Sequence, residues 1–261
     1  MSGGELDETL TADPSAAAAP SAAAGPIAPG SLALGRYEVI RFIAAGAMGE
    51  VYEAVDRILG ATVAVKVMKP ALASSPRAVE RLVREIALAR KVTHPNVCRL
   101  HDVHQHDGRA FLSMELLAGE SLADRLRRGP LPEPELEDVA RQLVAALAAL
   151  HAAGIVHRDL KSGNIMLVPG DGGARAVVTD FGLARSLAPA GDARLTGDAT
   201  MLGTPAYMSP EQVEGREATP ASDIYSLGVV LFEMATGALP FQEETVLATA
   251  TARLTRDPPR S

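Results

Sequence analysis

The stretch Val156-His157-Arg158-Asp159-Leu160-Lys161-Ser162-Gly163-Asn164-Ile165-Met166 decides how the rest of the chain is interpreted. It places an acid, a base and an amide within six positions, between two apolar runs: Asp159, Lys161 and Asn164. That spacing suits one loop whose side chains all reach one reactive phosphate. Alone, the stretch can also be a charged turn, so its meaning depends on the sequence around it.

Length and composition limit what the chain can be. The 261 residues are enough to bury a substantial core in one or two domains. The apolar fraction of 47% overstates that core because much of it is alanine, and aromatic residues make up only 3%. The net charge of -7 gives no basic footprint for nucleic acid, so we expect no nucleic-acid partner.

Cysteine content and the terminal sequence bear on compartment. Cys98 is the only cysteine, which excludes an intrachain disulfide and a cysteine-rich zinc site and fits a reducing, cytoplasmic compartment. The first ten residues are acidic without a basic residue, so a secretory signal is not expected. No uncharged apolar run approaches the roughly 20 residues that span a bilayer, so we expect no membrane segment.

The chain divides into a leader and one folded domain. Residues 1–35 are rich in Ala and Pro with nothing to bury, which predicts a disordered leader. From Arg36 onward, short β-branched or aromatic runs alternate with glycine-bearing turns, which predicts an antiparallel meander. A helix is expected to begin at Ser75-Pro76 and to pack against this sheet. The expected strands are 37–43, 51–55, 62–68, 98–103 and 109–115.

After Glu115 the pattern becomes mainly helical. One long amphipathic helix is expected to end before Gly154, and a strongly apolar one at 224–236 before Gly237. The apolar stripe expected on the first consists of Leu136, Val139, Leu143, Val144, Leu147 and Leu150. Strands followed by helices indicate an α+β fold in two lobes, with a small lobe at about 36–114, a hinge at about 115–120 and a large lobe at about 121–261.

A glycine cluster, Ala44-Ala45-Gly46-Ala47-Met48-Gly49-Glu50-Val51, lies between two expected strands. Glycines let backbone N–H groups approach phosphate oxygens, although a plain hairpin turn explains the cluster as well. A P-loop is excluded because no Gly-Lys-Ser/Thr follows and no helix begins there. A dinucleotide-binding fingerprint is disfavoured because the next element is a strand.

Two charged residues come next. A lysine in mid-strand, such as Lys66, is usually solvent-facing, but the strand period puts it with Ala64 on one face, beneath the glycine loop. Glu85 lies on the inner side of the next helix, and we predict that it holds Lys66 as an ion pair. Asp180, at the end of an apolar strand before Phe181-Gly182, is placed to hold Mg²⁺ with Asn164, although Asp-Phe-Gly alone would favour a capped turn.

Taken together, these motifs resemble the eukaryotic-type protein kinase family, and are most similar to its bacterial Ser/Thr kinases. The resemblance runs from about Tyr37 to the end of the chain. It rests on Val63-Ala64-Val65-Lys66, Glu85, His94-Pro95-Asn96, Met114-Glu115, His157-Arg158-Asp159, Asp180-Phe181-Gly182, Gly203-Thr204-Pro205 with Ser209-Pro210-Glu211, and Asp223 to Gly228.

The resemblance implies a bilobal kinase fold, ATP and Mg²⁺ (or Mn²⁺) as cofactors, and protein substrates. It assigns the ATP phosphates to Gly46, Gly49 and Lys66, with Lys66 held by Glu85, and the metal to Asp180 and Asn164. Asp159 would accept the substrate hydroxyl proton while Lys161 stabilises the transferring phosphoryl group. The adenine would be sandwiched by Val51, Ala64 and Met166, hydrogen-bonded by the backbone of Glu115 and Leu117, and backed by Met114 as gatekeeper.

The resemblance also implies substrate class and regulation. Lys161 and Thr204 are similar to the residues of Ser/Thr kinases rather than tyrosine kinases. Arg158 resembles that of kinases switched on by phosphorylation of the activation segment, here 180–211, whose phosphate would pair with Arg158 and Arg185. Thr196 and Thr200 are the candidate phosphorylation sites, and Ser186 is a weaker one. A homodimer through the small lobe is a family expectation.

The chain departs from the family pattern at three points. Ala44 replaces the first glycine of the phosphate loop, and Ser162 stands where the family usually has proline, which should loosen the catalytic loop slightly. The family's large lobe continues for several helices, one of which supplies an arginine to the residue at Glu211. We therefore expect an incomplete large lobe and an unpaired Glu211.

Two readings of function follow. The first is a Ser/Thr protein kinase that also phosphorylates itself, and the rival is a catalytically silent nucleotide-binding or scaffolding module. Two smaller signals receive structural interpretations: His101, His104 and His106 are expected to be surface histidines without carboxylate partners, and His157 a core histidine that supports the loop.

Overall fold

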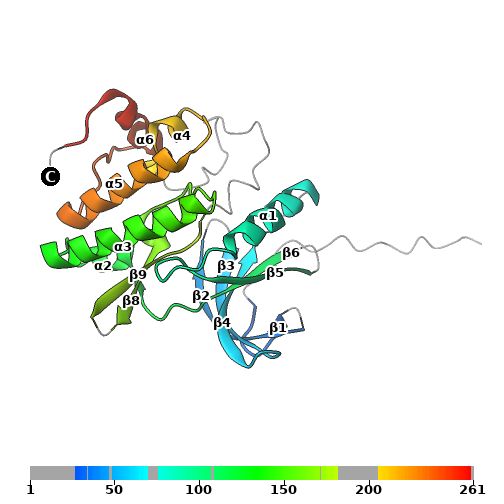
Figure 1. Ribbon diagram of the computed structural model, residues 1–261. Coiled ribbons are helices and arrows are strands. Elements are labelled where there is room, and N and C mark those ends of the chain that lie inside the picture. Colours follow the sequence, from blue (N-terminus) through cyan, green and yellow to red (C-terminus); the bar gives the residue numbers. More distant parts are fainter. Residues whose placement is uncertain are drawn as a thin grey trace, which may run out of the picture.

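The computed structural model describes residues 27–33, 35–46, 49–69, 76–106, 109–170, 172–181 and 205–259. Within these residues the chain forms a β-rich lobe that carries helix α1 and a mainly helical lobe that carries α2 to α6 (Figure 1). The predicted α+β, two-lobed architecture is therefore confirmed. None of the described helices has both the length and the apolarity needed to cross a bilayer.

The small lobe is built on a six-stranded antiparallel sheet in the order β1-β2-β3-β4-β6-β5. Its strands are β1 (Leu32–Ala33), β2 (Tyr37–Ala45), β3 (Gly49–Asp56), β4 (Ala61–Met68), β5 (Leu100–His106) and β6 (Arg109–Met114). Helix α1 (Pro76–Ala89) begins at the predicted Ser-Pro step and lies beside β5 (Figure 1).

The sheet begins earlier than predicted. Strand β1 pairs with β2 inside the segment that the sequence assigned to a disordered leader. Small residues can join a sheet through the backbone alone: the Gly30 N–H donates to the Val39 carbonyl at 2.8 Å, and the Val39 N–H donates to the Ser31 carbonyl at 2.9 Å. Composition could not reveal these bonds because they need no apolar side chain.

Strand β4 has the two-faced character that its period predicts. Val63, Val65 and Val67 pack into a small-lobe core that includes Tyr37 and Tyr52. Ala64 and Met68 face the other way, into the large core that continues into the helical lobe. Lys66 lies between these two residues in the alternation and is itself buried, so the sheet directs its ammonium toward the interior of the molecule.

The large lobe is organised by two helices that run side by side, α3 (Glu133–Ala152) and α5 (Pro220–Thr236) (Figure 1). Both end near a glycine with positive φ, Gly154 at 74° and Gly237 at 73°, a conformation that costs glycine little. The predicted stripe of α3 is confirmed at Val139, Leu143, Leu147 and Leu150. It is wrong at Val144, which is 53% exposed because it lies at the edge of the stripe.

Short elements complete the large lobe. They are α2 (Leu122–Leu126), a 3-10 turn at Ser162–Asn164, a second 3-10 turn at Pro205–Tyr207, α4 (Pro210–Val213) and α6 (Val246–Thr255). A three-stranded sheet, β7 (Glu120–Ser121), β8 (Ile165–Gly170) and β9 (Gly173–Val178), lies against α3. The 3-10 turn that contains Asn164 immediately precedes β8, so the sheet fixes where the turn sits.

Candidate active site

The loop after α3 is held by one buried carboxylate. Asp223 of α5 accepts hydrogen bonds from the backbone N–H groups of His157 and Arg158, each at 2.8 Å, and lies 2.7 Å from Nε2 of His151. Arg158 has a φ of 69°, which is costly for a residue with a side chain. Two N–H bonds to a carboxylate offset that cost and fix the loop's path.

His157 is fully buried and joins this loop to the strand that leads to Asp180. Its Nε2 lies 3.0 Å from the Thr179 carbonyl, and its Nδ1 accepts from the Asp159 N–H at 3.3 Å. Desolvation lowers the pKa of His157, so its imidazole is neutral and donates from Nε2. The predicted supporting role is confirmed.

The three polar residues of the opening stretch converge as predicted. Lys161 Nζ lies 2.9 Å from Asp159 Oδ2. The Asn164 amide nitrogen donates to the Asp159 carbonyl at 2.8 Å and to Oδ2 at 3.1 Å. The Asn164 carbonyl accepts from the Thr179 N–H at 2.8 Å, which brings the segment before Asp180 against the loop.

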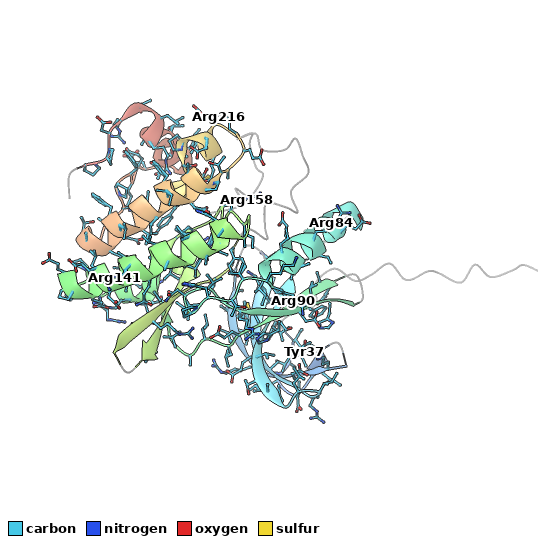
Figure 2. All side chains as sticks on the ribbon, viewed as in Figure 1. Tyr37, Arg84, Arg90, Arg141, Arg158 and Arg216 are labelled. Carbon is cyan, nitrogen blue, oxygen red and sulfur yellow. The ribbon has the colours of Figure 1, made fainter. Side chains whose placement is uncertain are left out.

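The predicted Lys66–Glu85 ion pair is wrong in this structure. Lys66 Nζ lies 2.7 Å from Asp180 Oδ1, while Glu85 Oε1 lies 3.6 Å from Arg158 Nη1. Figure 2 labels Arg158 near the end of α3.

The helical period placed Glu85 on the inner side of α1 but did not specify which cation that side would meet. A cavity of about 130 Å³ lies between α1 and the loop, with Phe181 at its wall. In this position of α1, Glu85 pairs with Arg158, and the buried ammonium of Lys66 is neutralised by Asp180 instead.

The residues assigned to adenine all belong to, or pack against, one core cluster. Ala64 and Met114 pair across β4 and β6, and both belong to the core cluster against which Val51, Leu117 and Met166 pack. These positions come from both lobes, so the core cluster continues from one lobe into the other.

One backbone group of the hinge, the Glu115 N–H, is already used within the protein. The Glu115 N–H donates to the Arg99 carbonyl at 2.9 Å, which leaves the Glu115 carbonyl as the group for an adenine donor. Arg175 of β9 bonds the Glu115 carboxylate at 3.0 Å and the Pro95 carbonyl at 2.8 Å. Sequence reasoning did not single out Arg175.

The two glycines of the phosphate loop differ in their roles. A Cβ on Gly49 would lie 2.0 Å from the Val67 carbonyl, so β3 and β4 require glycine there whatever the loop binds. A Cβ on Gly46 would meet nothing within 4 Å, and the Gly46 N–H closes the hairpin by donating to the Gly49 carbonyl at 2.8 Å.

The candidate regulatory residues of the activation segment are not covered by the structure. Arg185, Ser186, Thr196, Thr200 and Thr204 lie outside the described residues.

Two further expectations about partners are wrong. Glu211 accepts a hydrogen bond from the Ser222 hydroxyl and is therefore not unpaired. His104 has a carboxylate partner, Asp102, at 3.3 Å, because β5 places residues two apart on one face. Asp223 was named only as the start of the family motif Asp223 to Gly228, without a role, and His151 was not singled out.

A model of the protein kinase domain matches residues 37–257. The chain belongs to the protein kinase family. Among the relatives of this kinase chain, serine/threonine-protein kinase PknA of Mycobacterium tuberculosis is 41% identical over 231 residues, which are 86% of this chain and 52% of PknA. PrkC of Bacillus subtilis, also named a serine/threonine-protein kinase, is 37% identical over 226 residues, which are 86% of this chain and 34% of PrkC.

The solved structures agree with this kinase assignment. A double mutant of the Mycobacterium tuberculosis PknI kinase domain matches with a TM-score of 0.71 at 25% identity, covering 90% of this chain and 83% of that one. The resemblance to bacterial Ser/Thr kinases and the bilobal kinase fold are thus confirmed. The chain spans about half the length of the PknA relatives it matches.

Proposed function

We propose that this chain transfers the γ-phosphoryl group of ATP to serine and threonine hydroxyls of proteins, including its own activation segment. The observation that carries the proposal is the hydrogen-bonded cluster of Asp159, Lys161 and Asn164, next to the Lys66–Asp180 pair. The family uses ATP with a divalent metal, and its relatives are named for Ser/Thr kinase activity.

The residues present fit a divalent metal. Carboxylate and amide oxygens are the ligands that Mg²⁺ prefers, and Mn²⁺ accepts the same set. The Asp180 carboxylate and the Asn164 amide oxygen would hold the ion, since the Asn164 nitrogen already faces Asp159. A bound ion would neutralise charge on the ATP phosphates.

The nucleotide would lie among the apolar residues Val51, Ala64, Met114 and Met166, where the lobes meet. Its adenine would lie between Ala64 and Met166 and donate to the Glu115 carbonyl, with Leu117 supplying a backbone N–H. The Lys66 ammonium would exchange Asp180 for the α and β phosphates, beneath Gly46.

The chemistry needs one proton acceptor and one cation. The substrate hydroxyl would give its proton to Asp159 as its oxygen bonds to the γ-phosphorus, and ADP leaves with the electron pair of the broken P–O bond. Lys161 lies beside Asp159 and would meet the negative charge of the transferring group.

Activation would follow from a change of partner at Arg158. In the unphosphorylated chain, Arg158 pairs with Glu85. After phosphorylation of Thr196 or Thr200, Arg158 would pair with the phosphate. A phosphate carries more charge than a carboxylate and would draw Arg158 away, leaving Glu85 to Lys66. In a double variant, Thr196→Ala with Thr200→Ala, activity should stay at the unphosphorylated level after incubation with MgATP; activity that rises as in the parent would contradict this switch.

A direct assay tests the proposed function. The parent chain should incorporate γ-phosphate from labelled ATP with Mg²⁺, and Asp159→Asn should reduce incorporation at least a hundredfold, since it removes the proton acceptor. Asp257→Asn, at an exposed position, is the matched control and should retain parental activity. Equal signal in the parent and Asp159→Asn, or no signal in either, would favour the silent scaffold.

We also propose a cytoplasmic location, where ATP is available, with no nucleic-acid partner. Association of two chains through the small lobe is a further proposal. Sedimentation of the parent chain at several concentrations tests it, and a monomer at all of them would contradict it.

A further inference from the structure

The residue after Lys161 joins the catalytic loop to a part of the large lobe that the reaction does not touch. Ser162 is the first residue of the 3-10 turn that ends at Asn164, and its side chain is only 2% exposed. Its Oγ lies 2.9 Å from the Tyr207 hydroxyl and 3.2 Å from Glu233 Oε1. Where the family usually has proline, this chain has a buried hydroxyl with two side-chain partners.

Those partners already form a pair. The Tyr207 hydroxyl donates to Glu233 Oε2 at 2.7 Å, so its only proton is used. The Ser162 hydroxyl must therefore be the donor, either to the Tyr207 oxygen or to the other oxygen of Glu233. A carboxylate acceptor makes this bond stronger than one between neutral groups. Burial raises the pKa of Tyr207, so the phenol keeps its proton at physiological pH.

Both partners are fixed by the fold. Glu233 lies on α5, the same helix that supplies Asp223 to the start of the loop. Tyr207 lies in the 3-10 turn before α4, and its carbonyl accepts from the Ser226 hydroxyl of α5 at 2.8 Å. The loop is thus tied to α5 at two points, through Asp223 before Asp159 and through Ser162 after Lys161.

We propose that Ser162 is a positioning residue for phosphoryl transfer: its hydroxyl, held by Tyr207 and Glu233, sets the turn that carries Lys161 and Asn164. Asp159 lies between the two attachment points. Losing the second removes the side-chain tie between the start of the turn and α5, while the end of the turn keeps the bonds of Asn164 to Thr179 and Asp159. This proposal rests on the proposed kinase activity.

The activity test compares Ser162→Ala with Ser113→Ala. Both remove a buried serine hydroxyl with two hydrogen-bond partners, but Ser113 lies in β6 and bonds Tyr37 and Asp102. With casein as acceptor, Ser162→Ala should lower kcat about five- to tenfold and leave KM for ATP within twofold, because a lost hydrogen bond of ordinary strength has that size. Ser113→Ala should leave kcat unchanged. Parental kcat in Ser162→Ala, or the same kcat loss in Ser113→Ala, would overturn the proposal.

Coupling provides a second criterion. Glu233→Gln removes the charged acceptor, so Ser162→Ala should have little further effect on kcat in the Glu233→Gln background. Losses that multiply in the double variant would show that the two side chains act separately and would overturn the proposal.

Amide hydrogen exchange separates this inference from the proposed function. In Ser162→Ala, the Asn164 amide should exchange about fivefold faster or more, while amides in the middle of α3 keep parental rates. Absence of phosphoryl transfer by the parent would defeat the proposed function, and the exchange result would still decide the role of Ser162. Unchanged exchange at Asn164 would overturn it.

Discussion

At the scale of single residues, the site depends on polar groups buried far from the reacting atoms. Asp223 receives two backbone N–H groups and His151, and none of these contacts has a periodic signal in the sequence. Such a carboxylate is costly to bury and costly to disturb, because each N–H that it releases is left without an acceptor.

Replacing Asp223 with asparagine tests this support. One of its two acceptor oxygens becomes a nitrogen, so one buried N–H loses its partner and the charge opposite His151 disappears. We expect the free energy of unfolding to fall by about 3 kcal/mol, measured by urea denaturation. Asp257→Asn should change it by less than about 0.5 kcal/mol. A loss in Asp223→Asn no larger than this would mean that the loop is held by other contacts.

His157 predicts a dependence of stability on acidity. Its pKa is lowered in the folded chain, so below the ordinary histidine pKa of about 6.5 the unfolded chain binds more protons than the folded one. Stability from neutral His157 is complete above that pH and is lost as the pH falls toward the lowered pKa, by up to about 1.4 kcal/mol per unit.

The measurement compares urea unfolding at pH 7.5, 6.5 and 5.5 in the parent and in His157→Gln, which keeps a donor for Thr179. The parent should lose more stability than the variant over this range. Parallel losses would assign the acid sensitivity to other groups.

At the scale of elements, the hydrophobic period of the sequence predicted which face of a strand or helix each residue lies on. It did not predict which side chain that residue would contact. Ala64 and Lys66 share a face of β4 as the alternation predicts, and α3 and α5 end at their predicted limits, although α5 begins at Pro220 and not at the predicted 224. The partner of Glu85 was missed because the position of a helix over a sheet depends on packing across the whole interface. The sequence predicted that Ser162 would loosen the loop, and its bonds to Tyr207 and Glu233 were missed because those two residues are distant in sequence.

Gly46 and Gly49, in the hairpin between β2 and β3, allow a matched comparison of two Gly→Ala variants. Gly49→Ala should reduce the free energy of unfolding by about 2 to 3 kcal/mol, because its Cβ would lie 2.0 Å from a carbonyl in the neighbouring strand. Gly46→Ala should change it by less than about 1 kcal/mol, since nothing lies near its Cβ. The urea concentration at the midpoint of unfolding measures both effects. Equal losses of stability in the two variants would contradict the close contact between Gly49 and the Val67 carbonyl.

At the scale of the molecule, two ion pairs connect the small lobe to the large lobe. Lys66 with Asp180, and Arg158 with Glu85, each join the small lobe to the large one. Arg175 adds a third connection, from β9 to the hinge at Glu115. Family resemblance predicted which residues would face the space between the lobes, but the pairing among them depends on where α1 rests.

The ion pair between Arg175 and Glu115 predicts that loss of Arg175 weakens nucleotide binding but changes the free energy of unfolding little. Arg175→Ala should change the free energy of unfolding by less than about 1 kcal/mol, because the pair is partly exposed, yet weaken ATP binding about threefold to fivefold by loosening Glu115. Arg127→Ala removes a more exposed ion pair, with Asp124, and should leave ATP affinity unchanged. Calorimetric titration with ATP measures both, and equal affinities in the two variants would contradict a role for Arg175.

The occupied Glu115 N–H has a consequence for inhibitor design. At the proposed nucleotide site, an ATP-competitive compound could present a donor to the Glu115 carbonyl or an acceptor to the Leu117 N–H, since the Arg99 carbonyl already accepts the Glu115 amide hydrogen. Behind that site, Met114 is buried against Ala64, so a bulky substituent directed there would meet a filled wall. The cavity beside Phe181, at about 130 Å³, is smaller than the 300 Å³ or so that drug-sized ligands occupy. Compact scaffolds that reach outward from the hinge would therefore suit this chain better than those that extend past the gatekeeper.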